Sequence, residues 1–198
     1  MKLPIPKIWK GKTVTIVGGG PSLNGFDFGR LEGIVVGTNH SPKFHRADML
    51  VAIDQKFHER EGEWLDGLSC LKVTQNPTHR EDFIKVELEP DYENPHEDHD
   101  WTVLRANLSG FLALAVSLHL GAENIFLLGF DGGYTAGKET PNFHPYHYEG
   151  PGMNFYTPQN QYYDFYKDRK IINVGMYSRI AAFKRVDLKS DFYGLVNG

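Results

Sequence analysis

A glycine-rich turn follows the first apolar run of the chain. The β-branched run 12–18 ends at Gly18, Gly19 and Gly20, and Pro21-Ser22-Leu23 comes next. Small residues let backbone amides approach a phosphate closely, Ser22 can donate a hydrogen bond, and a helix that begins here adds positive potential. The pattern is not a dinucleotide fingerprint, because Leu23 stands at the third glycine position, and no Walker-type Gly-Lys-Ser/Thr follows. It indicates either a nucleotide-binding turn or a tight strand-to-helix turn without a ligand.

Polar residues close three later apolar runs. Asn39 follows IVVGT, Asp54 follows LVAI, and Asp131 follows NIFLLGF. Ligands of parallel α/β sheets bind at the carboxyl ends of the strands, so these side chains and the glycine turn belong to one rim. Ser109, at the head of an apolar helix, joins them there. Asn39 or Asp54 taken alone is more typical of a helix cap, but the convergence of all four favours a binding site.

Histidines and tyrosines gather in the long irregular segment 132–158. Connections of this length inside a compact domain are usually lids or binding segments. A histidine of near-neutral pKa can take a proton from an attacking hydroxyl, and tyrosine hydroxyls can stabilise phosphate oxygens. The candidates are His144, His147, Tyr134 and Tyr146. The alternative is an aromatic lid or a subunit contact that carries incidental histidines.

An acidic stretch with two histidines runs from His96 to Asp100. Asp98 and Asp100 form a carboxylate pair that could hold a divalent cation together with nucleotide phosphates, and the histidines could bind a transition metal. A solvated acidic loop is the commoner explanation, so we predict no metal site. The single cysteine, Cys70, lies in an apolar run and is typical of a core residue.

The elements that position these residues follow from the apolar runs and the turn residues between them. Strands are predicted at 12–18, 34–37, 49–53, 71–74, 124–128 and 170–174, with a further or edge strand at 84–88. Helices are predicted at 55–65, 158–167 and 178–183, and a buried helix at 111–120 with Ser109 as its N-cap and Gly121 as its stop. The alternation predicts an α/β fold, a single Rossmann-like domain with a mostly parallel sheet.

Length and charge narrow the function classes. The 198 residues carry 21 basic and 25 acidic side chains, a formal charge of -4. This length predicts one nucleotide-binding domain over residues 1–198, with a lid-like insertion at about 132–157. The charge argues against a broad basic face for nucleic acid or an anionic membrane. No apolar run is long enough to span a bilayer, and one cysteine suggests a reducing compartment, so we expect a cytoplasmic protein. The aromatic segment would also suit a homo-oligomer contact.

The order of these motifs resembles a known superfamily. Gly-x-Gly-Pro-Ser-Leu at 18–23, the strand end at Asn39, and the stretch from Leu108-Ser-Gly-Phe to Gly129-Phe-Asp are similar to those of the bacterial sialyltransferases built on a single Rossmann-like domain. They are equally similar to the broader superfamily that contains archaeal-type 6-hydroxymethylpterin diphosphokinases and many bacteriophage proteins. The similarity in motif order covers about residues 13–183, with the middle unmatched.

The resemblance implies roles for individual residues. In the sialyltransferases the glycine turn and the serine-glycine helix start hold a cytidine nucleotide donor, a role that falls here to Gly18, Gly20, Pro21, Ser22, Asn39, Ser109 and Gly110. Gly19 and Asp54 depart from the family, which has asparagines there. Tyr134 matches a phosphate-contacting tyrosine with a one-residue offset, and Tyr146 is nearest to its second partner. The general base of the family falls in the histidine-bearing loop, where we prefer His147 to His144.

The resemblance thus implies a transferase that uses an activated nucleotide donor. We expect a sialyltransferase-like glycosyltransferase that moves a sugar from a nucleotide sugar to an acceptor hydroxyl and requires no cofactor. One alternative is a Mg²⁺-dependent phosphotransferase of the pterin diphosphokinase type, with the metal held by Asp131, Asp54 or the Asp98/Asp100 pair. The other is a non-catalytic nucleotide-binding module. The departures at Gly19 and Asp54 leave the donor base, the sugar and the acceptor open.

Overall fold

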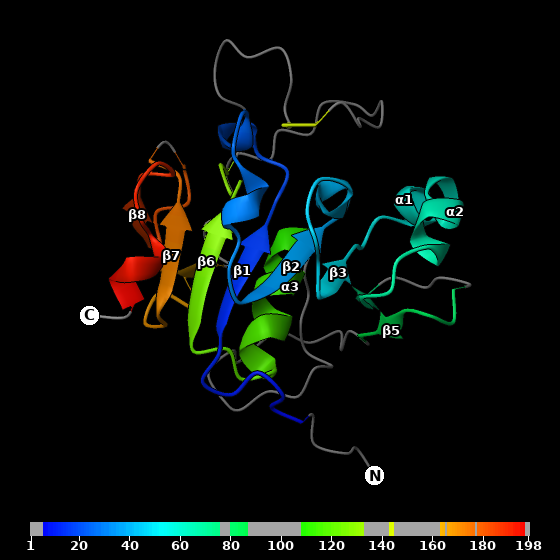
Figure 1. Ribbon diagram of the computed structural model, residues 1–198. Coiled ribbons are helices and arrows are strands. Elements are labelled where there is room, and N and C mark those ends of the chain that lie inside the picture. The colour runs from blue at the N-terminus through cyan, green and yellow to red at the C-terminus, as the bar shows by residue number, and fades with distance from the viewer. Residues whose placement is uncertain are drawn as a thin grey trace.

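The computed structural model describes residues 6–75, 80–86, 108–132, 143–144, 163–164, 166–176 and 178–196. They form an α/β domain around one eight-stranded sheet (Figure 1). Its strands are β1 (Thr13–Val17), β2 (Ile34–Thr38), β3 (Met49–Val51), β4 (Leu71–Thr74), β5 (Ile84–Lys85), β6 (Asn124–Leu128), β7 (Ile171–Val174) and β8 (Lys184–Val186). The α-helices are α1 (Gln55–Arg60), α2 (Gly62–Asp66) and α3 (Ser109–His119), and short 3-10 helices are η1 (Pro21–Leu23), η2 (Phe28–Arg30), η3 (Ser41–Lys43) and η5 (Tyr193–Val196).

All neighbouring strands of the sheet run parallel, in the order β5-β4-β3-β2-β1-β6-β7-β8. The predicted α/β fold with a mostly parallel sheet is therefore confirmed. The chain builds outward from β1 to β5 and then crosses to the other side of β1 with β6. Val17, the last residue of β1, pairs with Gly37 of β2 and with Leu128 of β6. This reversal between β1 and β6 is the switch point at which open parallel sheets bind their ligands.

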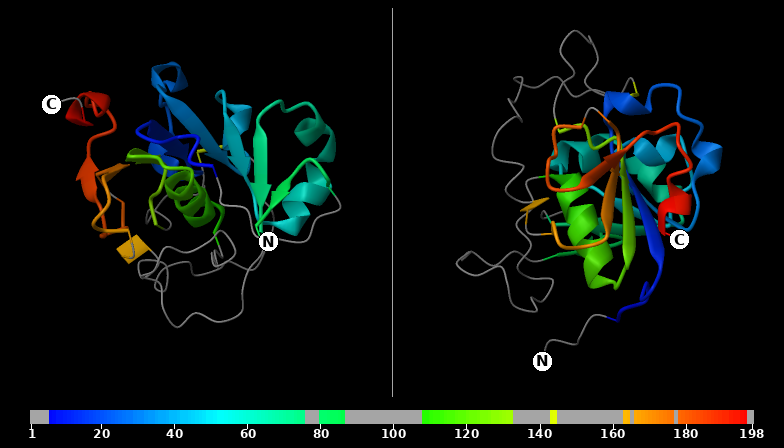
Figure 2. Two further views of the ribbon diagram at one scale, coloured as in Figure 1. Left: turned by 90° about the horizontal axis from the view of Figure 1, so that it is seen from below. Right: turned by 90° about the vertical axis from the view of Figure 1, so that its left-hand side faces the viewer.

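Each face of the sheet has its own core. On β1, Val14 and Ile16 pack in the core that contains α3, whereas Val17 packs with Phe126 and Phe192 on the opposite face. Residues 111–116 of α3 are each 1% exposed or less, as expected from a helix that is apolar on nearly every side. Figure 2 shows α3 and the C-terminal η5 on opposite sides of the sheet. Since both faces are covered, a ligand can reach the sheet only at its edges, and open parallel sheets bind at the carboxyl edge.

One of the predicted helices is divided into two, and another is wrong. The helix predicted at 55–65 is divided into α1 and α2 at Glu61, which has φ -101° and ψ 16° and whose carboxylate accepts hydrogen bonds from η3 and the residue before it. Residues 178–183 are not helical, because Ser178 Oγ donates to Phe130 O and accepts from Ile180 N, which fixes a turn. The chain then enters β8, which the sequence pattern does not predict.

The predicted helix at 158–167 and the insertion at 132–157 lie mostly outside the described residues. Of the insertion, the structure describes residues 132, 143 and 144. In the part of the chain that is described, no helix combines the length and the apolar character needed to cross a bilayer.

Candidate functional site

The glycine turn lies at the carboxyl end of β1 and is joined to the end of β6 by three backbone amides. Gly18 N and Gly20 N donate to the carbonyl oxygens of residues 128 and 129, with N···O distances of 2.7 and 2.9 Å. Ser22 N, at the start of η1, donates to Asp131 Oδ2 at 2.8 Å. The amides predicted to face a phosphate are thus bonded within the protein. The backbone amides of Gly18, Gly20 and Ser22 are therefore not available to a ligand, which would have to contact other atoms of these residues.

The glycines of the turn are required by the close approach of β1 to the end of β6. A β-carbon on Gly20 would lie 2.5 Å from both Asp131 Oδ2 and Gly129 O, and one on Gly18 would lie 2.7 Å from Gly129 O. Real β-carbons do not approach oxygens this closely, so side chains are excluded at both positions. Pro21 is buried and occupies the first position of η1. The sequence Gly-x-Gly-Pro-Ser therefore fixes Ser22 beside Asp131.

A second pair of predicted residues meets at the carboxyl end of β2. Ser109 Oγ donates to Asn39 Oδ1 at 2.9 Å and accepts from Ile53 N at 3.2 Å. The prediction of Ser109 as an N-cap is wrong: Leu108 occupies that position without a side-chain cap, and Ser109 is the first helical residue of α3. Its hydroxyl instead ties α3 to the ends of β2 and β3. Asn39 has φ 49°, a left-handed conformation that asparagine tolerates better than most residues.

Two other predicted site residues, Asp54 and Gly110, have structural roles in the fold. Asp54 is exposed, and its carboxylate accepts from Lys56 N at 2.8 Å as the N-cap of α1. Gly110 lies against the ring of Phe130, where a β-carbon would be 2.8 Å from the nearest ring carbon. This contact joins the start of α3 to the residue after β6. Ser22 with Asp131 and Asn39 with Ser109 are thus the polar pairs that the structure brings together at the carboxyl edge.

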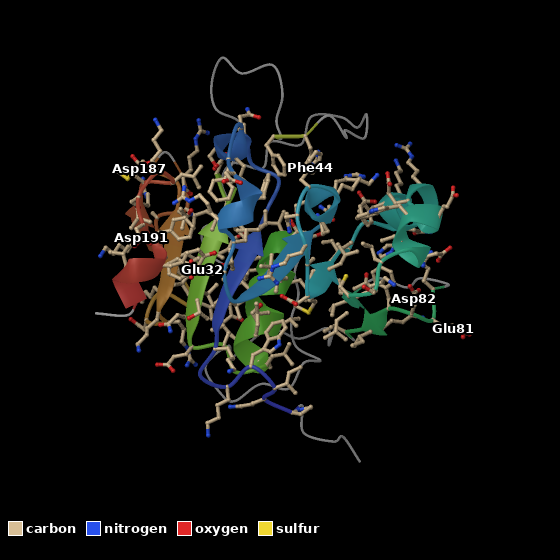
Figure 3. The ribbon with its side chains drawn as sticks, viewed as in Figure 1. Glu32, Phe44, Glu81, Asp82, Asp187 and Asp191 are labelled. Atoms are coloured by element: carbon tan, nitrogen blue, oxygen red, sulfur yellow. The ribbon has the colours of Figure 1, made fainter. Side chains whose placement is uncertain are left out.

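His144 lies in an aromatic cap that it forms with Phe28, Phe44 and Phe143. Phe143 N donates to Gly19 O at 3.0 Å, which fixes this part of the predicted lid against the glycine turn. The His144 ring stacks on Phe44 at a centroid distance of 6.0 Å, and Phe143 contacts both Phe28 and Phe44. Phe44 is 40% exposed at the end of the sheet toward which the strands point (Figure 3), whereas His144 is only 6% exposed. The cap therefore closes the carboxyl edge next to β1 and β2.

His40, which the sequence did not single out, contacts this cap through the ring of His144. Its ring lies 5.5 Å from that of His144, and its Nε2 is 3.0 Å from Glu61 Oε1. Lys43 Nζ binds the other carboxylate oxygen at 2.6 Å. Burial lowers the pKa of His40 and the hydrogen bond to Glu61 opposes that shift in part. For Glu61 the burial would raise the pKa, but the hydrogen bonds from Lys43 and His40 outweigh it and lower the pKa.

Nothing in the sequence links His40 to Glu61, because the two residues are 21 positions apart and belong to different elements. The placement of His40 directly after Asn39 was the available signal, since any residue there must lie at the carboxyl edge. Tyr134, Tyr146, His147 and the Asp98/Asp100 pair lie outside the described residues. Within the described ranges, no group of three or more histidine, cysteine, aspartate or glutamate side chains is arranged to hold a metal ion.

The chain was compared with protein-family models, with curated sequences and with solved structures, and one solved structure has a similar fold. No protein-family model matches the chain, and neither does any curated protein sequence. Among solved structures, the chain is similar to the sialyltransferase CstII from Campylobacter jejuni, determined in complex with the substrate analogue cytidine-5'-monophosphate, with a TM-score of 0.57 and 17% sequence identity. The match covers 92% of this chain and 88% of the other. At this identity it shows a shared fold.

Proposed function

We propose that this protein is a transferase that binds an activated nucleotide donor at the carboxyl edge of its sheet, and that the donor is a nucleotide sugar. The observation that carries the proposal is the convergence at the switch point: the Ser22–Asp131 pair follows β1 and β6, the Asn39–Ser109 pair follows β2, and these three strands are neighbours in the sheet. Switch points of parallel sheets are where nucleotides bind. The shared fold with a sialyltransferase that binds a cytidine nucleotide supports a donor of this class.

Different residues at the carboxyl edge would bind different parts of the donor. The N-terminal end of the eleven-residue helix α3 carries positive potential, which favours a phosphate group near Ser109 and Gly110. Asn39 and Ser109 supply a side-chain amide and a hydroxyl at the same end of the sheet. The aromatic cap, which contacts the glycine turn through Phe143, would shield the donor from water.

The proposed reaction is attack of an acceptor hydroxyl on the anomeric carbon of the sugar, with inversion at that carbon. A histidine takes the hydroxyl proton, the bond from the anomeric carbon to the nucleotide phosphate breaks, and the phosphate leaves with the bonding electrons. We assign the base to His147, with His144 as the alternative. The 6% exposure of His144 within the aromatic cap favours His147, because the base must reach an acceptor. Tyr134 and Tyr146 would stabilise the leaving phosphate.

A turnover assay with EDTA tests this proposal. Purified protein is incubated with a panel of nucleotide sugars and sugar acceptors, and release of free nucleotide is measured by chromatography. We expect release from at least one donor, unaffected by EDTA, and a loss of about 10² to 10⁴ in rate for His147→Ala. Unchanged turnover in a variant that lacks both His144 and His147 would overturn the assignment of the base.

The same assay separates the two alternative functions. A Mg²⁺-dependent phosphotransferase of the pterin diphosphokinase type would lose its activity in EDTA, because its metal neutralises charge on the transferred phosphates. A non-catalytic nucleotide-binding module would show a ligand-dependent rise of melting temperature without turnover of any donor. Nucleotide release that persists in EDTA excludes both.

A further inference from the structure

Three side-chain oxygens converge on a small recess above Gly175, the residue that follows β7. From the position that a β-carbon on Gly175 would occupy, Asn173 Oδ1 lies at 3.7 Å, Asp131 Oδ1 at 3.8 Å and Ser22 Oγ at 3.9 Å. These are ordinary contact distances, so the missing side chain leaves room for about one methyl-sized group. Neither Asn173 nor Gly175 belongs to a motif that the sequence singles out. Together with the Ser22–Asp131 pair, they extend the candidate site from β1 and β6 to β7.

The orientation of the Asn173 amide is fixed by its other contacts. Its Nδ2 lies 3.2 Å from Phe130 O and 2.7 Å from Ser178 Oγ. A carbonyl oxygen only accepts, so the amide nitrogen must be the atom that faces Phe130, and Oδ1 must face the recess. Asn173 is 1% exposed, and its Oδ1 is a buried acceptor that receives no hydrogen bond from the residues that the structure describes.

The other two oxygens of the recess belong to Ser22 and Asp131. Ser22 Oγ is buried and makes no hydrogen bond within the described part of the chain. Asp131 uses Oδ2 to accept from Ser22 N, which leaves Oδ1 on the side of Gly175. Buried polar atoms without partners cost free energy, and native proteins keep few of them unless a ligand or water completes the set. The recess therefore has two acceptors, one of them charged, and one hydroxyl.

We infer that this recess binds a hydrogen-bond donor of the nucleoside, a ribose hydroxyl or an exocyclic amine, and thereby sets the direction in which the nucleotide lies. The inference rests on the proposed function. A phosphate is excluded from the recess, because its oxygens would face the Asp131 carboxylate and the Asn173 carbonyl oxygen. The nucleoside thus lies over β1, β6 and β7. The phosphate and the transferred group lie toward Asn39 and the N-terminal end of α3.

Gly175→Ala is the variant that tests the recess most cleanly. Its φ is outside the left-handed region and its β-carbon would meet only ordinary contacts, so the fold should tolerate it. The added methyl would occupy the space that the nucleoside donor needs. Gly67→Ala is the matched control, because Gly67 lies at the end of α2 and its β-carbon would be 3.5 Å from Trp64 O. Ser22→Ala is a second variant, and it removes a hydroxyl that makes no hydrogen bond to the described residues.

Isothermal titration with CMP, UMP, AMP, GMP and pyrophosphate gives the readout. We expect Gly175→Ala to bind the preferred monophosphate about tenfold more weakly than the unaltered protein, Ser22→Ala to bind it more weakly as well, and Gly67→Ala to bind it equally. Pyrophosphate binding should not change in any variant. Deoxy and dideoxy analogues then separate a ribose hydroxyl from a base amine.

Each contrary result has a different meaning. If the unaltered protein binds a monophosphate and both Gly175→Ala and Ser22→Ala bind it equally well, the inference is wrong and the proposed function stands. A parallel loss of pyrophosphate affinity in Gly175→Ala would also overturn the inference, because it would place phosphate in the recess. If the unaltered protein binds none of the monophosphates, the proposed function fails as well.

Discussion

The carboxylate of Asp131 accepts a hydrogen bond of 2.8 Å from the backbone amide of Ser22, a residue 109 positions earlier in the chain. This bond joins the ends of β1 and β6 at the switch point. Asp131→Ala leaves the Ser22 amide without its acceptor, and we expect it to lower the free energy of unfolding by about 1–3 kcal/mol in urea denaturation. Asp131→Asn keeps an oxygen acceptor and should lose less. Equal losses in the two variants would show that the hydrogen bond does not hold the turn.

Gly20 lies close to the same carboxylate of Asp131. A β-carbon there would lie 2.5 Å from Asp131 Oδ2 and from Gly129 O, and neither oxygen can move without breaking the turn. We expect Gly20→Ala to lower the free energy of unfolding by about 2 kcal/mol or more, as overpacked cores do. Gly67→Ala is the control and should change it by less than about 0.5 kcal/mol. Similar stabilities of the two variants in urea denaturation would contradict the close approach described here.

Asn39 combines a left-handed backbone with a side chain that binds Ser109, and two substitutions separate these features. Both Asn39→Gly and Asn39→Ala remove the bond to Ser109 Oγ, but only alanine brings a β-carbon to φ 49°. We expect Asn39→Ala to be about 1–2 kcal/mol less stable than Asn39→Gly in thermal or urea unfolding. Nucleotide affinity should fall equally in both. Unaltered affinity in Asn39→Gly would remove the Asn39 side chain from the proposed site.

Stability should depend on pH through three histidines whose pKa is lowered in the folded chain. Burial lowers the pKa of His40, His45 and His58 below the ordinary value of 6.5, with partial opposition from hydrogen bonds to Glu61, Arg46 O and Ala52 O respectively. The unfolded chain therefore binds more protons than the folded chain just below pH 6.5. The stabilisation is complete above that pH and is lost as pH falls through the lowered values.

Urea denaturation between pH 7.5 and pH 5 measures this effect, and we expect the free energy of unfolding to fall over roughly that range. His58→Gln removes one of the three groups while it keeps a polar side chain near Ala52 O, so its pH dependence should be shallower. A free energy of unfolding that rises as the pH falls would contradict the direction of the shifts.

Much of the edge could be predicted from the sequence because it depends on local patterns. Apolar runs that end in Gly18, Asn39 and Asp131 are strand ends in any parallel sheet, so these residues had to share one rim. The side-chain pairs Ser22–Asp131 and Asn39–Ser109 could not be predicted, because they depend on the register of the strands and on where α3 packs against the sheet. Ser109 is the clearest case: its hydroxyl binds Asn39 and Ile53 N, which lie far away in the sequence, rather than its own helix.

The residues that sequence reasoning missed are those whose side chains contact residues far away in the sequence. His40 depends on Glu61, where one predicted helix becomes two. Asn173 lies inside a strand pattern that predicts only burial, and its role follows from Phe130 O and Ser178 across the chain. The predicted helix at 178–183 fails for the same reason, because Ser178 binds the end of β6 instead of capping a helix. Local propensity cannot predict such tertiary hydrogen bonds.

A heteronuclear NMR titration of the backbone amides with CMP and the other monophosphates tests the central claim most directly. We predict that saturating nucleotide shifts the amide signals of the glycine turn, of Asn39, Gly110 and Gly175, while those of β4 and β5 at the far edge of the sheet stay in place. Shifts confined to β4 and β5, or no shifts with any monophosphate at millimolar concentration, would contradict a nucleotide site at the switch point.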